Sequence, residues 1–396
     1  MRRTTLKVGL IDGPSYQPLY RSFAEFSERT GIEIQIVFQG AHPDLNRFVQ
    51  KTFESGENAF DLLSTHTKYV PSQAPYLLSL NEAFSTEELG DFSPALLELA
   101  RYNSQLMSIP RNFDARLLFY RTDRFAELAI EVPRTWHELS EAAQQLQAAG
   151  YTGFVYPGKE SGLFGTFFEL LISEGGRLFN ENLQPAFYSR SGIEALRRLK
   201  ELYQKKLTPA ALPDYHYDEV STSFRSGDST MATDWPGYWG LLNDDACIVR
   251  DKFGVALTPS SECGKRAVYC GSHSFAVTAA SERQDEAIEL LKFITSPEIQ
   301  AIDAANGHVP VRLSLMDRIK QGAEDHPIES RRWALLEETI ETSVIIPPKF
   351  AEYPETEDIL WQSLRRCIIG SLTEEQALSE AASAISKIVS KYSQSC

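Results

Sequence analysis

The stretch FRSGDSTMATDWPGYW, from Phe224 to Trp239, places an acidic side chain and three aromatic rings on a Pro-Gly turn. Asp234 precedes Trp235, and Tyr238 and Trp239 follow within the same turn. Leaving several large rings in water is costly. We therefore expect the turn either to pack into the core or to meet a ligand. We assign Trp235 to a cleft and Trp239 to the core.

The chain carries no pattern typical of a catalytic or metal site. It lacks GxSxG, SxxK, P-loop, GxGxxG and HExxH motifs, and it shows no cluster with metal-ligand spacing. A glycosidase carboxylate pair could be drawn among its many acidic residues, but no spacing specifies one. We therefore expect a protein that is not an enzyme and that needs no cofactor and no metal.

Composition sets the broad class of protein. A length of 396 residues suggests two or three domains, and the net charge of −15 argues against nucleic-acid and anionic-membrane partners. There is no apolar run long enough for a transmembrane helix. The opening MRRTTLKVGLIDG is too polar for a signal peptide. The chain is thus expected to be cytosolic, or to be a mature exported protein whose signal has been removed.

Cysteine spacing leaves the redox state open. Cys263 and Cys270 flank a short Gly-Lys-Arg segment and could be bridged across a hairpin turn. The count of five leaves at least one free thiol. We favour mostly free cysteines.

Hydrophobic patterning predicts the elements that must position these side chains. The first 65 residues read as strand, helix, strand, helix, strand, which is typical of a parallel sheet with crossover helices. Ligands of such sheets bind beyond the carboxyl ends of the strands. The residues expected at this edge are Asp12, Gly13, Pro14, Ser15, Gln39, Gly40, Thr65, His66 and Thr67.

Further α/β elements follow, and the C-terminal third reads as helical. TWHELSEAAQQLQAAG predicts a helix with a capping box, since Glu138 follows Thr135 by three residues. Trp136 is expected to pack this helix onto its domain. Trp333 and Trp361 are expected in the core, although Trp361 could also face a cleft.

Five sequence blocks carry a resemblance to a known family. They are FDLLSTHTKYVPSQAPYLLSLNEA, SIPRNFDARLLFYRTDRFAELAIEVPRTWHELSEAAQQL, FRSGDSTMATDWP, GSHSFAVTAASERQDEAIELLKFITSPEIQ and GHVPVRLSL. In this order they resemble the family 1 extracellular solute-binding proteins of ABC importers, which are maltose-binding-protein-like and bind carbohydrates. Thr230, Arg121 and Ser272 stand where the family commonly has Ala, Asn and Gly.

The resemblance implies the α/β, two-lobed periplasmic-binding-protein fold of type II. The chain would cross between lobes near 111–114, 270–274 and 313–318. The expected N-terminal lobe is 1–112 plus 274–315, and the expected C-terminal lobe is 113–273 plus 316–396. The lobes are joined by a hinge, and the ligand binds in the cleft between them and shifts the population toward closure.

The resemblance also implies that aromatic side chains of the turn at 234–239 bind a sugar. An aromatic ring can cover the apolar face of a sugar, and polar groups can bind its hydroxyls. The candidate ligand-binding residues are Trp235, Asp114, Arg111, Asn112, His66, Asp234, Tyr238, Gly271, Ser272, His273, Arg312, Tyr156, Ser161, Gly162, Tyr16, Gln39 and Tyr353.

Several of these assignments have structural alternatives. Asp114 either binds the ligand or makes a structural hydrogen bond in the hinge. Arg111 is either the counter-ion of Asp114 or a ligand donor, and Arg312 is either a ligand contact or half of an interlobe ion pair. The segment from Tyr215 to Tyr217 is expected to be solvated surface.

The implied function is the substrate-binding component of an ABC transporter. Its partners would be a small carbohydrate and the permease subunits. It would be a monomer, and it would be periplasmic or extracellular and membrane-associated. Two alternatives stay open. One is a two-lobed carbohydrate-active enzyme, and the other is a binding protein for an anionic sugar derivative, motivated by Arg111, Arg312, Lys68 and His66.

Overall fold

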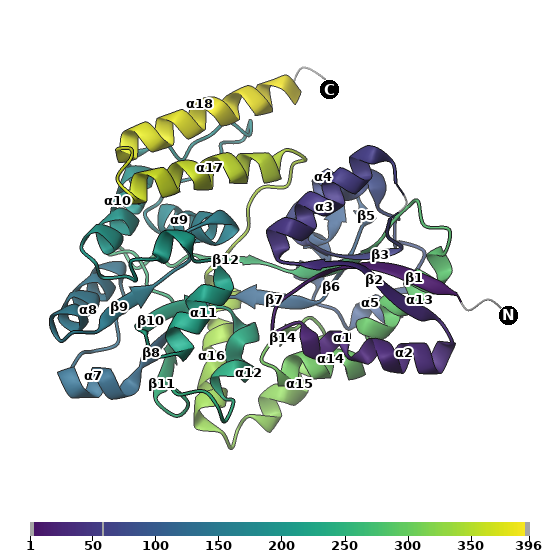
Figure 1. The fold of residues 1–396 in the computed structure, drawn as a ribbon, viewed down its shortest axis with the longest axis horizontal. Coiled ribbons are helices and arrows are strands. Elements are labelled where there is room, and N and C mark those ends of the chain that lie inside the picture. The colour runs from purple at the N-terminus through teal and green to yellow at the C-terminus, as the bar shows by residue number, and fades with distance from the viewer. Residues whose placement is uncertain (1–3, 58, 393–396) are drawn as a thin grey trace.

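The computed structural model describes residues 4–57 and 59–392. Figure 1 shows two α/β bodies side by side, with short strands running between them. We call the body that contains β1 the first lobe and the body that contains β8 the second lobe. The predicted two-lobed α/β fold is confirmed.

The first lobe is built on a five-stranded sheet in the order β2-β1-β3-β13-β6. Its strands are β1 (Thr5–Ile11), β2 (Glu33–Gly40), β3 (Leu62–His66), β6 (Ile109–Pro110) and β13 (His273–Val277). β1 is parallel to β2 and β3, as the sequence predicts, and β13 is antiparallel to both β3 and β6. The helices of this lobe are α1 (Gln17–Tyr20), α2 (Ser22–Thr30), α3 (His42–Ser55), α13 (Gln284–Ile294) and α14 (Pro297–Ala305).

The second lobe is built on a four-stranded sheet in the order β11-β8-β10-β9. Its strands are β8 (Leu117–Arg121), β9 (Thr152–Val155), β10 (Ser229–Asp234) and β11 (Phe253–Ala256). α8 (Trp136–Ala148), α9 (Glu160–Ser173), α10 (Arg190–Gln204) and α11 (Tyr217–Arg225) belong to this lobe. The predicted capping box of Thr135 and Glu138 begins α8, and Trp136 is buried as expected.

A third sheet, in the order β14-β7-β12-β15, lies where the lobes meet. It contains β7 (Asn112–Ala115), β12 (Val268–Gly271), β14 (Val309–Pro310) and β15 (Val344–Ile345). β7 and β12 coincide with two of the predicted crossings, whereas 313–318 lies in helix α15 (Leu313–Gly322). The lobe boundaries remain a prediction.

The C-terminal third is helical, as predicted. α16 (Pro327–Thr342) contacts β11, β15 and β7, while α17 (Tyr353–Ile368) packs on α9, α10 and α18 (Glu374–Tyr392). Figure 1 shows α17 and α18 lying along one side of the second lobe. α17 also contacts η1 (Thr67–Tyr69) of the first lobe, so it spans the gap between the two lobes.

Shorter elements complete the chain. They are α4 (Val70–Gln73), η2 (Ala74–Tyr76), α5 (Thr86–Gly90), α6 (Pro94–Leu99), β4 (Arg101–Tyr102), β5 (Gln105–Leu106), α7 (Thr122–Leu128), η3 (Leu212–Asp214), η4 (Pro236–Tyr238) and α12 (Trp239–Leu242). Within the described residues, no helix is both long and apolar enough to cross a membrane.

The expectations for tryptophan and cysteine can also be compared with the structure. Trp239 and Trp333 are buried, as expected, and Trp361 is half-buried. Cys263 and Cys270 are free, as are Cys247 and Cys367, so the favoured prediction of free thiols is confirmed for these four. Cys396 lies outside the described residues.

A buried ion pair ties the hinge strands to the core of the second lobe. Arg116, between β7 and β8, places Nη2 2.7 Å from Oε2 of Glu169 on α9, and both side chains are about 1% exposed. Glu169 Oε1 also accepts the backbone N–H of Tyr269 in β12, at 2.8 Å. One carboxylate thus holds two crossing strands against α9.

Glu169→Gln should therefore lower the free energy of unfolding strongly. Losing one partner of a buried pair leaves the other charge uncompensated, which costs about 3–5 kcal/mol. Glu174→Gln is the matched control, because its pair with Arg198 is longer, 3.6 Å, and about a quarter exposed. It should cost about 1 kcal/mol or less. Equal urea-unfolding curves for the two variants would contradict this role of Glu169.

Candidate ligand-binding site

A cavity of about 60 Å³ lies between the lobes, next to the hinge sheet. The first lobe and the adjoining hinge segments contribute residues from the β1–α1 loop, the end of β3, η1 and β13. The second lobe contributes residues from α9, α11 and the turn after β10. The lining residues are Ser15, Tyr16, His66, Lys68, Asp114, Ser161, Tyr217, Trp235, Gly237, Tyr238, Tyr269, Gly271, His273 and His308.

Aromatic rings form the wall on the side of the second lobe. Trp235 is half-buried, and its ring contacts Tyr217 edge-on with centroids 5.5 Å apart. The guanidinium of Arg116 lies 5.1 Å from the centroid of the Trp235 ring. The Tyr238 hydroxyl donates a 2.6 Å hydrogen bond to Asp218. Ring contacts on Trp235 and the bond of Tyr238 fix these two aromatic side chains in place.

Asp114 lies at the hinge end of the cavity. Its Oδ1 accepts a 2.7 Å hydrogen bond from Asn112 Nδ2, and its Oδ2 lies 3.6 Å from His273 Nε2. Burial raises the pKa of Asp114 to about 7, against the opposing effects of Arg111 and of hydrogen bonds from Asn112 and the His273 backbone. Burial lowers the pKa of His273 well below its usual value, with Arg111 acting in the same direction. The hinge end therefore holds a neutral imidazole beside a carboxyl that can exchange a proton near neutral pH.

Arg111 is buried beneath the cavity floor. It donates two hydrogen bonds to Asp303 of α14, at 2.6 and 2.8 Å, and its guanidinium lies 4.6 Å from the centroid of the Tyr16 ring. Its counter-ion is thus Asp303 and not Asp114, which corrects one of the sequence alternatives. The charge of Arg111 is satisfied before any ligand enters.

Lys68, which lines the cavity, forms another buried ion pair. Its Nζ donates to both carboxylate oxygens of Glu357 on α17, at 2.8 and 3.0 Å. The two side chains are 4% and 5% exposed. Tyr353 also donates to Glu357 Oε2, at 2.7 Å. This pair connects the first lobe to the second across the cavity rim.

Two glycines allow close approach at the cavity. A Cβ at Gly271 would lie 2.2 Å from His66 Cε1, and a Cβ at Gly237 would lie 2.3 Å from His308 Cε1. Any side chain at either position would push an imidazole away from the cavity wall. Gly271 was predicted from sequence and Gly237 was not.

One polar atom in the wall lacks a partner. The Tyr269 hydroxyl is buried and has no hydrogen-bond partner among the described residues. An unsatisfied buried hydroxyl costs free energy, which a polar ligand can recover. The described residues include no group of three or more His, Cys, Asp or Glu that could hold a metal ion.

The structure brings about half of the predicted site residues to the cavity. Those that line it are Trp235, Asp114, His66, Tyr238, Gly271, His273, Ser161 and Tyr16. Others lie directly behind the lining through bonds or chain neighbours, namely Arg111, Asn112, Asp234, Ser272, Gly162 and Tyr353. They act, at most, by holding the lining residues in place.

Three predicted residues do not reach the cavity. Tyr156 is fully buried and donates its hydroxyl to the Leu199 carbonyl, at 2.9 Å. Gln39 is exposed and donates to Asp12 at 2.8 Å, and Arg312 pairs with Asp91 at 3.3 Å. A strand end can be recognised from sequence, but the direction of each side chain beyond it cannot.

Several lining residues were missed or misplaced. The expectation that the 215–217 segment is solvated surface is wrong for Tyr217, which lines the cavity. Tyr269 and His308 were not singled out, although Tyr269 lies in β12 and His308 directly precedes β14. Both residues lie in or beside segments that cross between the lobes. Assigning the residues around every such crossing to the cleft would have predicted them.

Comparisons with known proteins agree with this geometry. A family model described as bacterial extracellular solute-binding protein matches residues 12–301. A "probable ABC transporter-binding protein" of Deinococcus radiodurans is 27% identical over 234 residues, 57% of this chain and 56% of that protein, so the match spans little more than half of its length.

Two further matches cover almost the whole chain. A "probable amino-acid ABC transporter periplasmic-binding protein" of Sinorhizobium fredii is 25% identical over 383 residues, 93% of this chain and 85% of that protein. The solved structure of maltose-bound MalE3 of T. maritima is 26% identical, has a TM-score of 0.89, and covers 97% of this chain and 100% of that one. These matches extend the fold assignment to nearly the full length.

Two buried carboxyls, Asp114 and Asp234, should each destabilise the ligand-free protein as pH rises from about 4 to about 7. Three histidines whose pKa values burial lowers, His216, His273 and His308, act in the opposite direction. Burial raises the pKa of Asp114, and separately of Asp234, from 3.8 to about 7. In this window the folded protein keeps carboxyl protons that the unfolded chain has lost, so at these two groups raising the pH favours unfolding. At about 1.4 kcal/mol per pKa unit, each carboxyl contributes on the order of 4 kcal/mol.

Urea unfolding at a series of pH values measures this slope. Relative to wild type, Asp114→Asn should become progressively more stable as pH rises through this window, and Asp234→Asn should show the same trend independently. A slope that Asp114→Asn leaves unchanged would show that the carboxyl at the hinge titrates normally.

Proposed function

Because this chain belongs to the bacterial extracellular solute-binding protein family, we propose that it binds one uncharged sugar or polyol between its lobes. The family consists of binding proteins and not of enzymes, and its name places its members outside the cytoplasm. The protein would deliver its ligand to the permease of an ABC importer as a monomer. Ligand that contacts both lobes would favour the closed form, which the permease recognises.

The observation that carries this proposal is the composition of the cavity wall. Aromatic side chains on the second lobe face a hinge floor that contains Asp114, His66 and His273. Such a wall can cover the C–H face of a sugar while carboxylate, imidazole and tyrosine groups bind its hydroxyls. The solved relative named above is bound to maltose, and its fold covers 97% of this chain at a TM-score of 0.89.

The charges at the site favour a neutral ligand over an anionic one. Arg111 is paired with Asp303, Lys68 with Glu357, and Arg312 with Asp91 away from the cavity. Each cation is thus compensated by a carboxylate of the protein itself. A ligand carboxylate or phosphate would have to displace one of these partners or lie buried without a counter-ion, which is unfavourable.

The same argument weighs against a free amino acid, the ligand class named for the Sinorhizobium relative. An amino acid carries a carboxylate and an ammonium group, and both need partners when they are buried. The cavity volume of about 60 Å³ accommodates on the order of five water-sized groups. This space is smaller than a sugar ring with its hydroxyls, so the cavity has to widen to take one ring and has no room for a second.

A thermal-shift screen tests the proposal. Neutral sugars and polyols should raise the melting temperature in a saturable way without turnover, whereas sugar acids, phosphorylated sugars and amino acids should not. Titration calorimetry of each hit should give an affinity that is indifferent to salt concentration, because no ion pair forms on binding. A hit that is anionic and strongly salt-dependent would contradict the proposed ligand class.

Trp235→Ala should weaken binding about 10- to 100-fold while leaving the fold intact. The ring is half-buried at the cavity, so truncation removes ligand contact without opening the core. Central aromatic contacts of this kind cost about 1–3 kcal/mol when truncated. Trp235→Phe is the matched control, since it keeps a ring at the site and should retain most of the affinity. Unchanged affinity of Trp235→Ala would remove this side chain from the site.

A further inference from the structure

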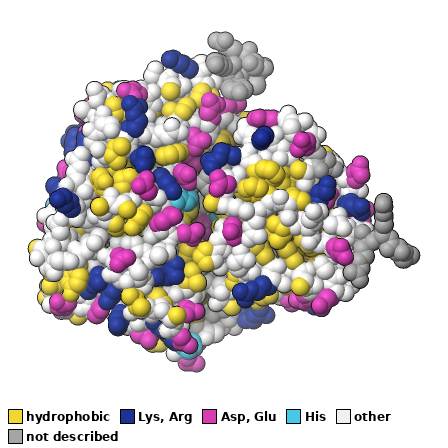
Figure 2. Space-filling view, in the orientation of Figure 1, with side chains coloured by type: hydrophobic (Ala, Val, Ile, Leu, Met, Phe, Trp, Pro, Cys, Tyr) yellow, Lys and Arg dark blue, Asp and Glu magenta, His cyan; other side chains and the backbone are white. Residues whose placement is uncertain are grey.

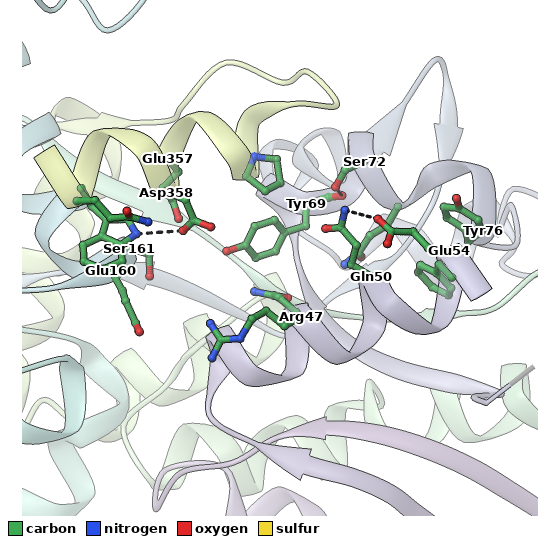
Figure 3. A pocket seen from close by; sticks show the side chains of 16 residues that line it. Arg47, Gln50, Glu54, Tyr69, Ser72, Tyr76, Glu160, Ser161, Glu357 and Asp358 are labelled. Carbon is green, nitrogen blue, oxygen red and sulfur yellow. Dashed lines mark hydrogen bonds between the residues drawn. The ribbon is translucent and has the colours of Figure 1, made fainter. Parts of the chain in front are cut away.

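A second, larger hollow lies on the outer side of the Lys68–Glu357 pair. We call it the outer groove, and its volume is about 290 Å³. It runs between α3, η1, α4 and η2 of the first lobe and α9 and α17 of the second. Figure 3 shows Arg47, Gln50 and Glu54 on one side, and Glu357 and Asp358 on the other, with Tyr69 between them.

The lining of the outer groove is chemically similar to that of the cavity. Aromatic rings come from both lobes, and amides and carboxylates stand between them. The groups concerned are Phe53, Tyr69, Tyr76, Trp361, Asn46, Gln50, Gln73, Gln362, Glu54, Glu160 and Asp358. Figure 2 shows acidic and basic side chains, with a histidine, gathered on this face along the line where the two halves meet.

The outer groove and the cavity are neighbours that share one lining residue and are bridged by an ion pair. Ser161 lines both, Lys68 lines the cavity, and Glu357 lines the outer groove. The hydrogen bonds from Lys68 Nζ to the Glu357 carboxylate therefore cross the boundary between the two spaces. The pair is the partition that separates them.

This partition is held on both sides. Tyr353 donates to Glu357 Oε2, and the Lys68 ammonium lies 4.9 Å from the centroid of the Tyr69 ring. Both charged side chains are about 95% buried. A buried charged pair held in this way is costly to separate, since each ion would be left uncompensated.

We propose that the Lys68–Glu357 pair determines ligand length by closing the cavity against the outer groove. The inference rests on the proposed function. With the pair in place, the protein binds a ligand of one ring. With both side chains shortened, the two spaces join, and a ligand of two or three rings extends from Trp235 into the outer groove.

The test compares wild type with Lys68→Ala/Glu357→Ala. Shortening both residues together leaves no unpaired buried charge, so the variant should fold, and its circular dichroism and melting curve verify this. Titration calorimetry uses D-glucose, maltose, maltotriose, cellobiose and cellotriose, with ribitol and D-mannitol as short polyols. The variant should gain at least about tenfold in affinity for a two- or three-ring sugar relative to wild type, about 1.4 kcal/mol.

The matched control is Lys68→Met/Glu357→Leu. It removes both charges but keeps the volume of the partition, so it should bind longer sugars no better than wild type. A gain in this control equal to that of the alanine pair would show that charge, and not bulk, sets ligand length, and would overturn the inference.

The outcomes separate the inference from the proposed function. Suppose that wild type binds a one-ring sugar or a polyol, and that the double alanine variant shows no increased affinity for two- or three-ring sugars. The inference about the Lys68–Glu357 pair is then wrong, and the proposed function stands. Wild type that already binds maltotriose as tightly as the alanine pair would also overturn the partition. If wild type binds none of these neutral compounds, the proposed function itself fails.

Discussion

The ion pair of Arg111 and Asp303 is the constraint on which the site depends. Arg111 sits where the chain leaves the first sheet for the hinge, and its backbone N–H donates to the His273 carbonyl at 2.7 Å. Gln300 of α14 donates to the Arg111 carbonyl at 2.8 Å, so side chain and backbone are both tied to one helix. The guanidinium also lies against the ring of Tyr16. One residue thus joins the crossing strand, the helix beneath it and the cavity floor.

The same principle recurs around the cavity. Arg116 beneath Trp235 is neutralised by Glu169, and Lys68 at the rim is neutralised by Glu357. In each case the carboxylate comes from a helix and does not itself line the cavity, so the protein supplies the counter-ion that an anionic ligand would otherwise provide. Buried cations next to aromatic rings then serve to position those rings. The proposed preference for a neutral ligand follows from this arrangement.

Sequence alone predicted two kinds of feature. These are the features that follow from local hydrophobic periodicity, and those that follow from the five sequence blocks that resemble the family. The strand and helix periodicity gave the first parallel sheet, and the five blocks gave the two-lobed fold and the first two crossings. Trp235, Asp114 and His273 reached the cavity because they flank a strand end or a crossing. Tyr156, next to such a strand end, instead faces the core, since side-chain direction depends on packing that no short pattern records.

The ion pairs were beyond the reach of sequence reasoning. Lys68 and Glu357 are 289 positions apart, and Arg111 and Asp303 are 192 apart. No local signal distinguishes these acids from the many others in a chain of net charge −15. The arginines and the lysine therefore suggested an anionic ligand until their partners were placed.

A crystal structure of the protein with a compound selected by the screen tests the central claim most directly. The account predicts a neutral, polyhydroxylated ligand between the two lobes, with one face on the Trp235 ring and a hydroxyl within hydrogen-bond distance of Asp114, and with Arg111 still bound to Asp303. A ligand whose acidic group has displaced Asp303 or Glu357 from its cation, or one bound away from Trp235, would contradict it.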